Sequence, residues 1–203
     1  MRPPRAQPVI LLATTLSLAA CSSTPSAPPA YALEGEACDA VSTSVFEPLT
    51  GPAPTKTSSH LLAGLSGGNC DVRLEGANGF MTLKVFIAIN PDHDAARKMY
   101  DKFEAGDKTD ADRADNVLRS VTVSQVKGLG QEAYLRRGHD VGKAWKPVDT
   151  FLYKYEVLDG SLVLSYLSSG YAKDPATGWP ASEQELQDII RKATEQLMKK
   201  IAE

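Results

Sequence analysis

Two turn dipeptides with alternating flanks constrain the fold of this chain most. Asn78-Gly79 and Asp159-Gly160 favour two-residue type I′ turns, because both central residues of such a turn need a positive φ. Each turn then sets apolar residues opposite one another on one face of a hairpin. The predicted pairs are Val157 with Leu162, Tyr155 with Leu164 and Tyr153 with Tyr166, and, around the first turn, Leu74 with Leu83, Val72 with Val85 and Cys70 with Ile87.

A helix is predicted after each hairpin. Asn90-Pro91 suits a helix start, and the apolar stripe that follows it ends at Gly106. Ser182 begins a capping box that leads into a second amphipathic stripe. Residues 120–126 and 132–136 are expected to be further strands. We therefore expect an α+β fold, an antiparallel β-sheet built from hairpins with amphipathic helices packed on one face. The repeated order of hairpin and helix suggests two related halves.

The first residues have the pattern of an export signal. Arg2 and Arg5 precede an apolar run that is shorter than the roughly 20 residues of a membrane-spanning helix. Leu18-Ala19-Ala20-Cys21 matches a bacterial lipobox, in which the Cys21 sulfur receives diacylglycerol. The alternative is an ordinary secretory signal. We expect a signal peptide at residues 1–20, a lipidated Cys21 with a Pro/Ser/Ala-rich tether at residues 21–35, and a single domain at residues 36–203.

The charge of the mature chain argues against nucleic acid as a partner. Removal of Arg2 and Arg5 leaves 20 basic residues against 25 acidic ones, a formal charge of −5. No basic patch with interleaved aromatic residues is present. The expected partners are the membrane, reached through two acyl chains, and an envelope ligand or protein.

Cysteine usage agrees with export. Once Cys21 is lipidated, Cys38 and Cys70 remain, and an even pair in an exported chain points to a disulfide. Two free thiols are the alternative.

The motifs that suggest chemistry fail in their context. Gly64-Leu65-Ser66-Gly67-Gly68 matches a nucleophile elbow, but Ser66 precedes a strand where the motif requires a helix. The acidic run from Asp107 to Asp115 lacks the calcium ligands of an EF-hand and is expected to be a solvated loop. Asp92-His93-Asp94 is better explained as a helix start than as a metal site. We therefore expect no catalytic residues, no metal and no cofactor.

The second hairpin carries an aromatic cluster formed by Phe151, Tyr153, Tyr155 and Tyr166. It could line a pocket for an apolar ligand. Aromatic residues at strand spacing are more often simple core, so both interpretations stay open.

Several of these features together resemble a family of actinobacterial envelope lipoproteins of unknown function. The features are Cys21, Cys38, Cys70, the Gly128-Leu129-Gly130-Gln131-Glu132-Ala133-Tyr134 segment and the C-terminal amphipathic helix. The resemblance implies a Cys38–Cys70 disulfide and an antiparallel sheet with helices on one side, similar to extracellular sensor domains of mycobacterial receptor kinases. It brings no enzymatic residues. Ala37 and Val72 depart from the family, which commonly has proline and an aromatic residue near these places.

The expected function is that of a non-enzymatic, lipid-anchored module on the extracytoplasmic face of the cell membrane that binds a ligand or a protein. A carrier of lipid or glycolipid is the alternative, and a serine hydrolase using Ser66 is a remote one.

Overall fold

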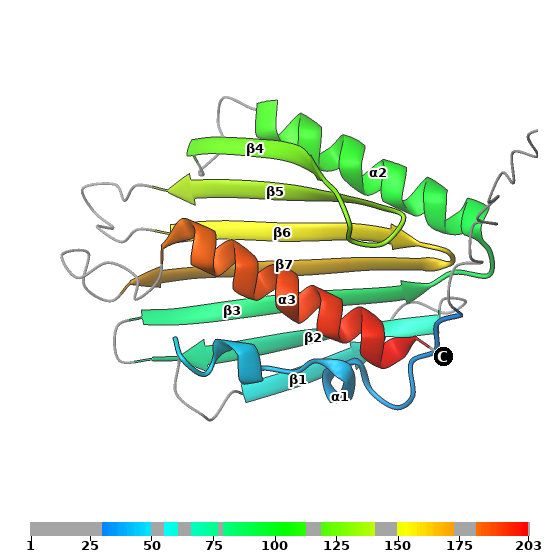
Figure 1. Cartoon of the computed structure of the whole chain (residues 1–203), viewed down its shortest axis with the longest axis horizontal. Helices are drawn as coiled ribbons and strands as arrows, with labels where there is room; N and C mark the ends of the chain where they lie inside the picture. Colours follow the sequence, from blue (N-terminus) through cyan, green and yellow to red (C-terminus); the bar gives the residue numbers. More distant parts are fainter. Residues whose placement is uncertain are drawn as a thin grey trace, which may run out of the picture.

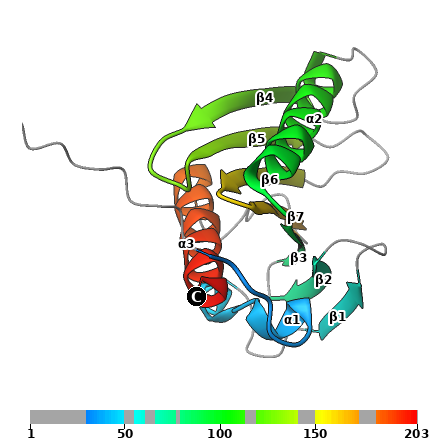
Figure 2. The ribbon, with the colours of Figure 1, turned by 90° about the vertical axis from the view of Figure 1, so that its right-hand side faces the viewer.

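A seven-stranded antiparallel sheet with helices on both faces forms the domain (Figures 1 and 2). The computed structural model describes residues 30–49, 55–60, 66–76, 79–112, 119–140, 150–172 and 182–202. The expected signal peptide and Cys21 lie outside the described residues. The α+β class and the antiparallel sheet are confirmed.

The strand order is β1-β2-β3-β7-β6-β5-β4, so the two predicted hairpins meet at the centre where β3 pairs with β7. The strands are β1 (Thr55–His60), β2 (Ser66–Glu75), β3 (Gly79–Ile89), β4 (Arg119–Val126), β5 (Glu132–Asp140), β6 (Thr150–Asp159) and β7 (Leu162–Ala172). The helices are α1 (Ala37–Ala40), the short 3₁₀ helix η1 (Ser44–Phe46), α2 (His93–Asp112) and α3 (Glu183–Ile201).

Both predicted hairpins form, but each register differs from the prediction by two residues. Asp159 pairs with Leu162, so the second turn is Gly160-Ser161, where Gly160 has a φ of 58°. In the first hairpin Val72 pairs with Leu83. A shift of two residues keeps every side chain on its predicted face, because side chains alternate with a period of two. Cys70 is therefore inward-facing as predicted and is fully buried.

The helices lie on opposite faces of the sheet, and the prediction that they pack on one face is wrong. In Figure 2, α3 and α2 lie on either side of the strands. Val157 and Leu164 belong to the main core, which α1, η1 and α3 cover, whereas Leu158 and Val163 pack with α2 in a second, smaller core. The second face carries Lys154 and Glu156 and is the more polar side of the hairpin in the sequence, but its paired Leu158 and Val163 are fully buried and provide an apolar base for α2. The two halves thus share the order of hairpin and helix but place their helices differently.

Helix α2 is longer than predicted and begins later. Asp92, rather than Asn90, caps its first turn by accepting a hydrogen bond from the Ala95 N–H at 2.8 Å. The helix continues past Gly106 and ends at Asp112. The prediction of a solvated loop is therefore wrong for residues 107–112. The open space around Gly106 puts no steric demand on its conformation, and contacts of Asp107 with the sheet hold the helix beyond it.

The C-terminal helix follows the prediction closely. Ser182 caps α3 and forms a reciprocal capping box with Glu185. The other end of α3 meets the start of the described chain, where Tyr31 forms an antiparallel bridge with Ala202. Tyr31 belongs to the expected tether at residues 21–35, so the last part of that segment is packed on the domain beside the end of α3.

Candidate functional site

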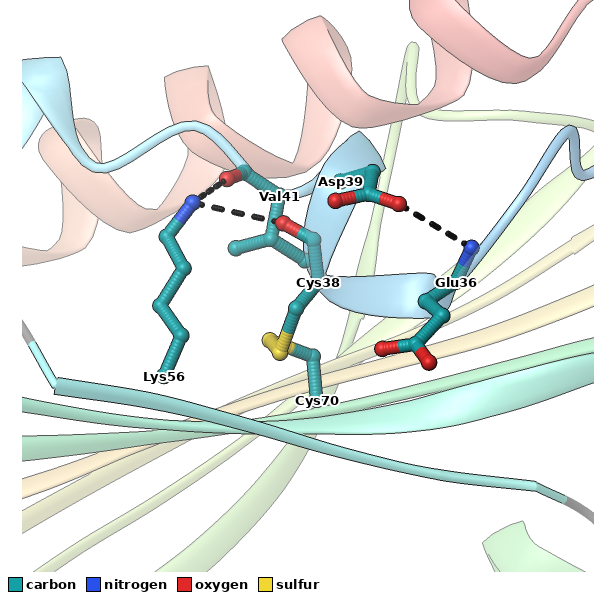
Figure 3. Close-up of a disulfide and its surroundings, with 6 residues drawn as sticks. All are labelled: Glu36, Cys38, Asp39, Val41, Lys56 and Cys70. Atoms are coloured by element: carbon teal, nitrogen blue, oxygen red, sulfur yellow. Dashed lines mark hydrogen bonds between the residues drawn. A yellow bond between two sulfur atoms is a disulfide. The ribbon is translucent and has the colours of Figure 1, made fainter.

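The disulfide ties the N-terminal segment to the sheet. Cys38 on α1 is bonded to Cys70 on β2 with a Cα–Cα distance of 4.9 Å (Figure 3). Lys56 of β1 reinforces this connection from the neighbouring strand. Its ammonium group donates to the backbone carbonyls of Val41 at 2.7 Å and Cys38 at 3.3 Å. Helix α1 is thus fixed by one covalent bond and by a cation that binds its carbonyl end.

The glycine-rich stretch before Cys70 has a structural explanation. Ser66 begins β2 itself and pairs with Ile89, so this part of the stretch is strand rather than a flexible loop. Gly67 has a φ of 131°, and a Cβ there would lie 2.0 Å from the Ile87 carbonyl oxygen. Only glycine fits such a close approach of two strands. The strand–turn–helix setting that a nucleophile elbow needs does not occur at Ser66.

The aromatic cluster of the second hairpin is buried under α3. Phe151, Tyr153, Tyr155 and Tyr166 each have no more than 4% of their surface exposed and belong to the main core. A cavity of about 370 Å³ lies elsewhere, where residues 32–34 and 39–40 meet residues 200–202. The burial of the four side chains agrees with the core interpretation. However, the Tyr166 hydroxyl and Ser168 Oγ are buried without a hydrogen-bond partner in the described part of the chain.

The most unusual chemistry lies on the other face, in a group of polar residues that we call the α2 ion cluster: Asp107, Tyr134, Arg136, Lys154 and Glu156. Asp107 extends from α2 and accepts hydrogen bonds from Tyr134 at 2.6 Å, Arg136 at 2.8 Å and Lys154 at 2.8 Å. The Lys154 ammonium also lies 2.9 Å from Glu156 Oε2. Glu156 is completely buried, and Ser165 on the neighbouring strand β7 lies opposite it.

The environment shifts the pKa values of the three ionisable groups at the centre of the α2 ion cluster, which are Asp107, Lys154 and Glu156. Burial raises the pKa of Glu156 to about 7, although the adjacent Lys154 charge opposes the shift. Burial also acts to raise the pKa of Asp107, but hydrogen bonds from Lys154 and Tyr134 outweigh it and lower the pKa. For Lys154, the two carboxylates overcome the effect of burial and raise the pKa. Near neutral pH, Asp107 and Lys154 are thus charged while Glu156 titrates.

The Gly128-Leu129-Gly130-Gln131-Glu132-Ala133-Tyr134 segment joins both helices to the sheet. Gly130 has a φ of 60°, and a Cβ there would lie 2.8 Å from the Leu158 carbonyl oxygen. Glu132 forms a bidentate ion pair with Arg97 of α2, at 2.7 and 2.5 Å. On the other side, Arg191 of α3 donates to the carbonyls of Lys127 and Gly128. The most distinctive sequence segment therefore has a structural role.

The Asp92-His93-Asp94 run lies at the start of α2, as the sequence predicts. Asp92 caps α2, and His93 Nδ1 lies 3.0 Å from the Gly160 carbonyl oxygen. No group of three or more potential ligands gathers among the residues that the structure describes. The described helices include none that is long and apolar enough to cross a membrane.

The comparisons with known proteins give a distant structural match. No family model matches the chain, and no curated protein sequence matches it. The fold is similar to the extracellular domain of PknH from Mycobacterium tuberculosis, with a TM-score of 0.40 and 12% identity over 84% of this chain and 98% of that one. Membership of the lipoprotein family stays a prediction.

Proposed function

We propose that this chain is a lipid-anchored, extracytoplasmic, non-enzymatic binding module of the cell envelope. The observation that carries the proposal is the buried Cys38–Cys70 disulfide. Structural disulfides persist in oxidising compartments and are rare in the cytoplasm. Together with the lipobox at Cys21, the disulfide supports a domain that is exported and then held at the membrane.

The position of Tyr31 sets how far the domain can be from its anchor. Nine residues lie between Cys21 and Tyr31, and the ten steps from one to the other span at most about 35 Å when fully extended. Tyr31 is fixed to the domain by its bridge to Ala202 and by the hydrogen bond from its hydroxyl to Asp159. The end of the domain where α3 finishes therefore lies within about 35 Å of the lipid anchor.

A role in binding fits the chemistry of the domain better than catalysis does. Ser66 lies at the start of a strand, away from any strand-to-helix turn. Asp107 is paired with both Arg136 and Lys154, and the completely buried Glu156 is inaccessible to a substrate. These groups hold a helix on the sheet.

Replacing Cys21 with alanine tests the anchor. We expect the wild-type chain to partition with membranes and to incorporate labelled palmitate, and the Cys21→Ala variant to do neither. Cys38→Ala is the matched control, because it also loses a cysteine but keeps the lipobox. Membrane partitioning and palmitate labelling that both survive in Cys21→Ala would contradict the proposal.

A carrier of lipid or glycolipid is the second candidate, and the unpartnered hydroxyls of Tyr166 and Ser168 favour it. Nearly all buried polar groups in native proteins have a hydrogen-bond partner, so a ligand's polar group would suit this place under α3. Native mass spectra of the purified protein, together with an organic extract, decide between the candidates. A carrier is expected to retain a lipid at near-unit stoichiometry and to lose it in Tyr166→Phe. A clean apo mass would contradict the carrier function.

A further inference from the structure

Helix α2 buries fewer apolar side chains than α3 does. It buries Ala96, Tyr100 and Asp107, one of them charged, whereas α3 buries seven residues, none charged. Elements with little apolar burial open locally at low free-energy cost. The attachment of α2 therefore depends strongly on its polar contacts. These include His93 with Gly160 and Arg97 with Glu132 near its start, Glu104 with Gln125 in its middle, and Asp107 in its second half.

The attachment through Asp107 depends on a shared cation. Lys154 Nζ lies 2.8 Å from Asp107 Oδ2 on the helix and 2.9 Å from Glu156 Oε2 on its own strand. The same ammonium lies 5.4 Å from the centre of the Phe103 ring, so α2 covers it. Ser165, across from Glu156, is buried as well. A charge on Glu156 has no access to water while α2 is docked.

We infer that α2 is a pH-dependent cover of the sheet, which lifts more often when the buried Glu156 carboxyl loses its proton and docks when the carboxyl is protonated. Ionised Glu156 competes with Asp107 for Lys154 and carries a buried charge. Lifting α2 hydrates that charge. Protonated Glu156 leaves Lys154 to Asp107, which strengthens the contact between helix and sheet.

The direction of the effect follows from linkage. Burial raises the pKa of Glu156 from 4.5 to about 7 while α2 is docked, and hydration in the lifted state returns it toward 4.5. The contribution of Glu156 to docking is complete below pH 4.5 and is lost as the pH rises through about 7. With these two pKa values, the fraction of molecules in which α2 is lifted increases about twentyfold between pH 5.5 and pH 7.5.

The other charged and titratable groups around Glu156 do not reproduce this effect. Asp107 has a lowered pKa and Lys154 a raised one, so both keep their charge in this range. His93, in the first turn of α2, is present in every protein compared below, so its contribution cancels. The groups that face the site are Tyr134 and Arg136 on β5, Lys154 on β6, and Tyr100, Glu104, Asp107 and Asp110 on α2, with the uncharged Ser165 on β7 and Phe86 on β3.

Hydrogen exchange at two pH values tests the inference on the full-length chain in detergent. Protection factors remove the intrinsic pH dependence of exchange. In the wild type, we expect protection of α2 to fall about twentyfold from pH 5.5 to pH 7.5 while protection of α3 stays constant. In Glu156→Gln, which keeps the shape but cannot ionise, α2 should change less than about twofold.

Constant α2 protection in the wild type would overturn the inference. So would a decrease that persists in Glu156→Gln, or a parallel decrease in α2 and α3, which indicates global unfolding. A second measurement needs no variant, namely the titration of the Glu156 carboxyl carbon by NMR in the wild type. A midpoint near 7 supports the inference, and a midpoint near 4.5 contradicts it.

Discussion

Asp107→Ala is expected to lower the free energy of unfolding by about 3 kcal/mol, because the variant leaves buried cations without their main partner. Lys154 and Arg136 have only 16% and 15% of their side chains exposed, and each lies 2.8 Å from Asp107. The Tyr134 hydroxyl, which is also buried, loses its acceptor. Chemical denaturation monitored by circular dichroism measures the change.

Asp110→Ala is the matched control for this prediction. Asp110 lies on the same helix and 3.8 Å from the same arginine, but 51% of its side chain is exposed. Exposed ion pairs contribute less than about 1 kcal/mol, so this variant should unfold nearly as the wild type does. Equal losses in the two variants would mean that burial of Asp107 does not determine its contribution.

The stability that Asp107 contributes depends on pH. It is present above the ordinary pKa of an aspartate and is lost as the pH falls through the lowered pKa of Asp107.

The strands of the two hairpins could be predicted because alternation and turn residues are both local. The registers were wrong by two residues, since Asp159-Gly160 and Gly160-Ser161 place the same side chains on the same face. Burial depends only on whether a residue has an odd or an even position along the strand, because side chains alternate between the two faces. The inward direction of Cys70 was therefore still predicted correctly. Strand β1 was not predicted, because its sequence from Thr55 to His60 has no apolar alternation. It is defined by pairing with β2.

The candidate site could not be found in the sequence because its members are far apart and locally ordinary. Asp107 follows a glycine in an acidic run, which is typical of a solvated loop. Lys154 and Glu156 alternate with tyrosines, so in the sequence they mark only the more polar side of the hairpin. What makes them a cluster is the placement of α2 on that side, and this follows from the buried Leu158–Val163 pair. One signal was available in the sequence. Tyr134, at the end of the distinctive glycine-containing segment, needs a partner for its hydroxyl once it is buried.

Removing the disulfide is expected to cost a similar amount of stability by a different route. The Cys38→Ala/Cys70→Ala double variant should lose about 3–4 kcal/mol, the loop-entropy value for cysteines 32 residues apart. Cys70 is fully buried and Cys38 nearly so, so part of the loss also reflects the missing sulfur atoms in the core. Denaturation of the oxidised wild type beside the double variant measures the difference.

The reduced wild type separates these two contributions. It keeps both sulfur atoms but frees the unfolded chain, so its unfolding midpoint should lie between those of the oxidised protein and the double variant. The Lys56 hydrogen bonds to the Cys38 and Val41 carbonyls remain in all three proteins, and they should keep α1 near β1 in the folded state. We therefore expect the sheet to fold without the disulfide, while proteolysis within residues 36–49 becomes faster. If reduction changes neither the midpoint nor the proteolysis, the disulfide does not stabilise the domain, and its support for an extracytoplasmic location is removed as well.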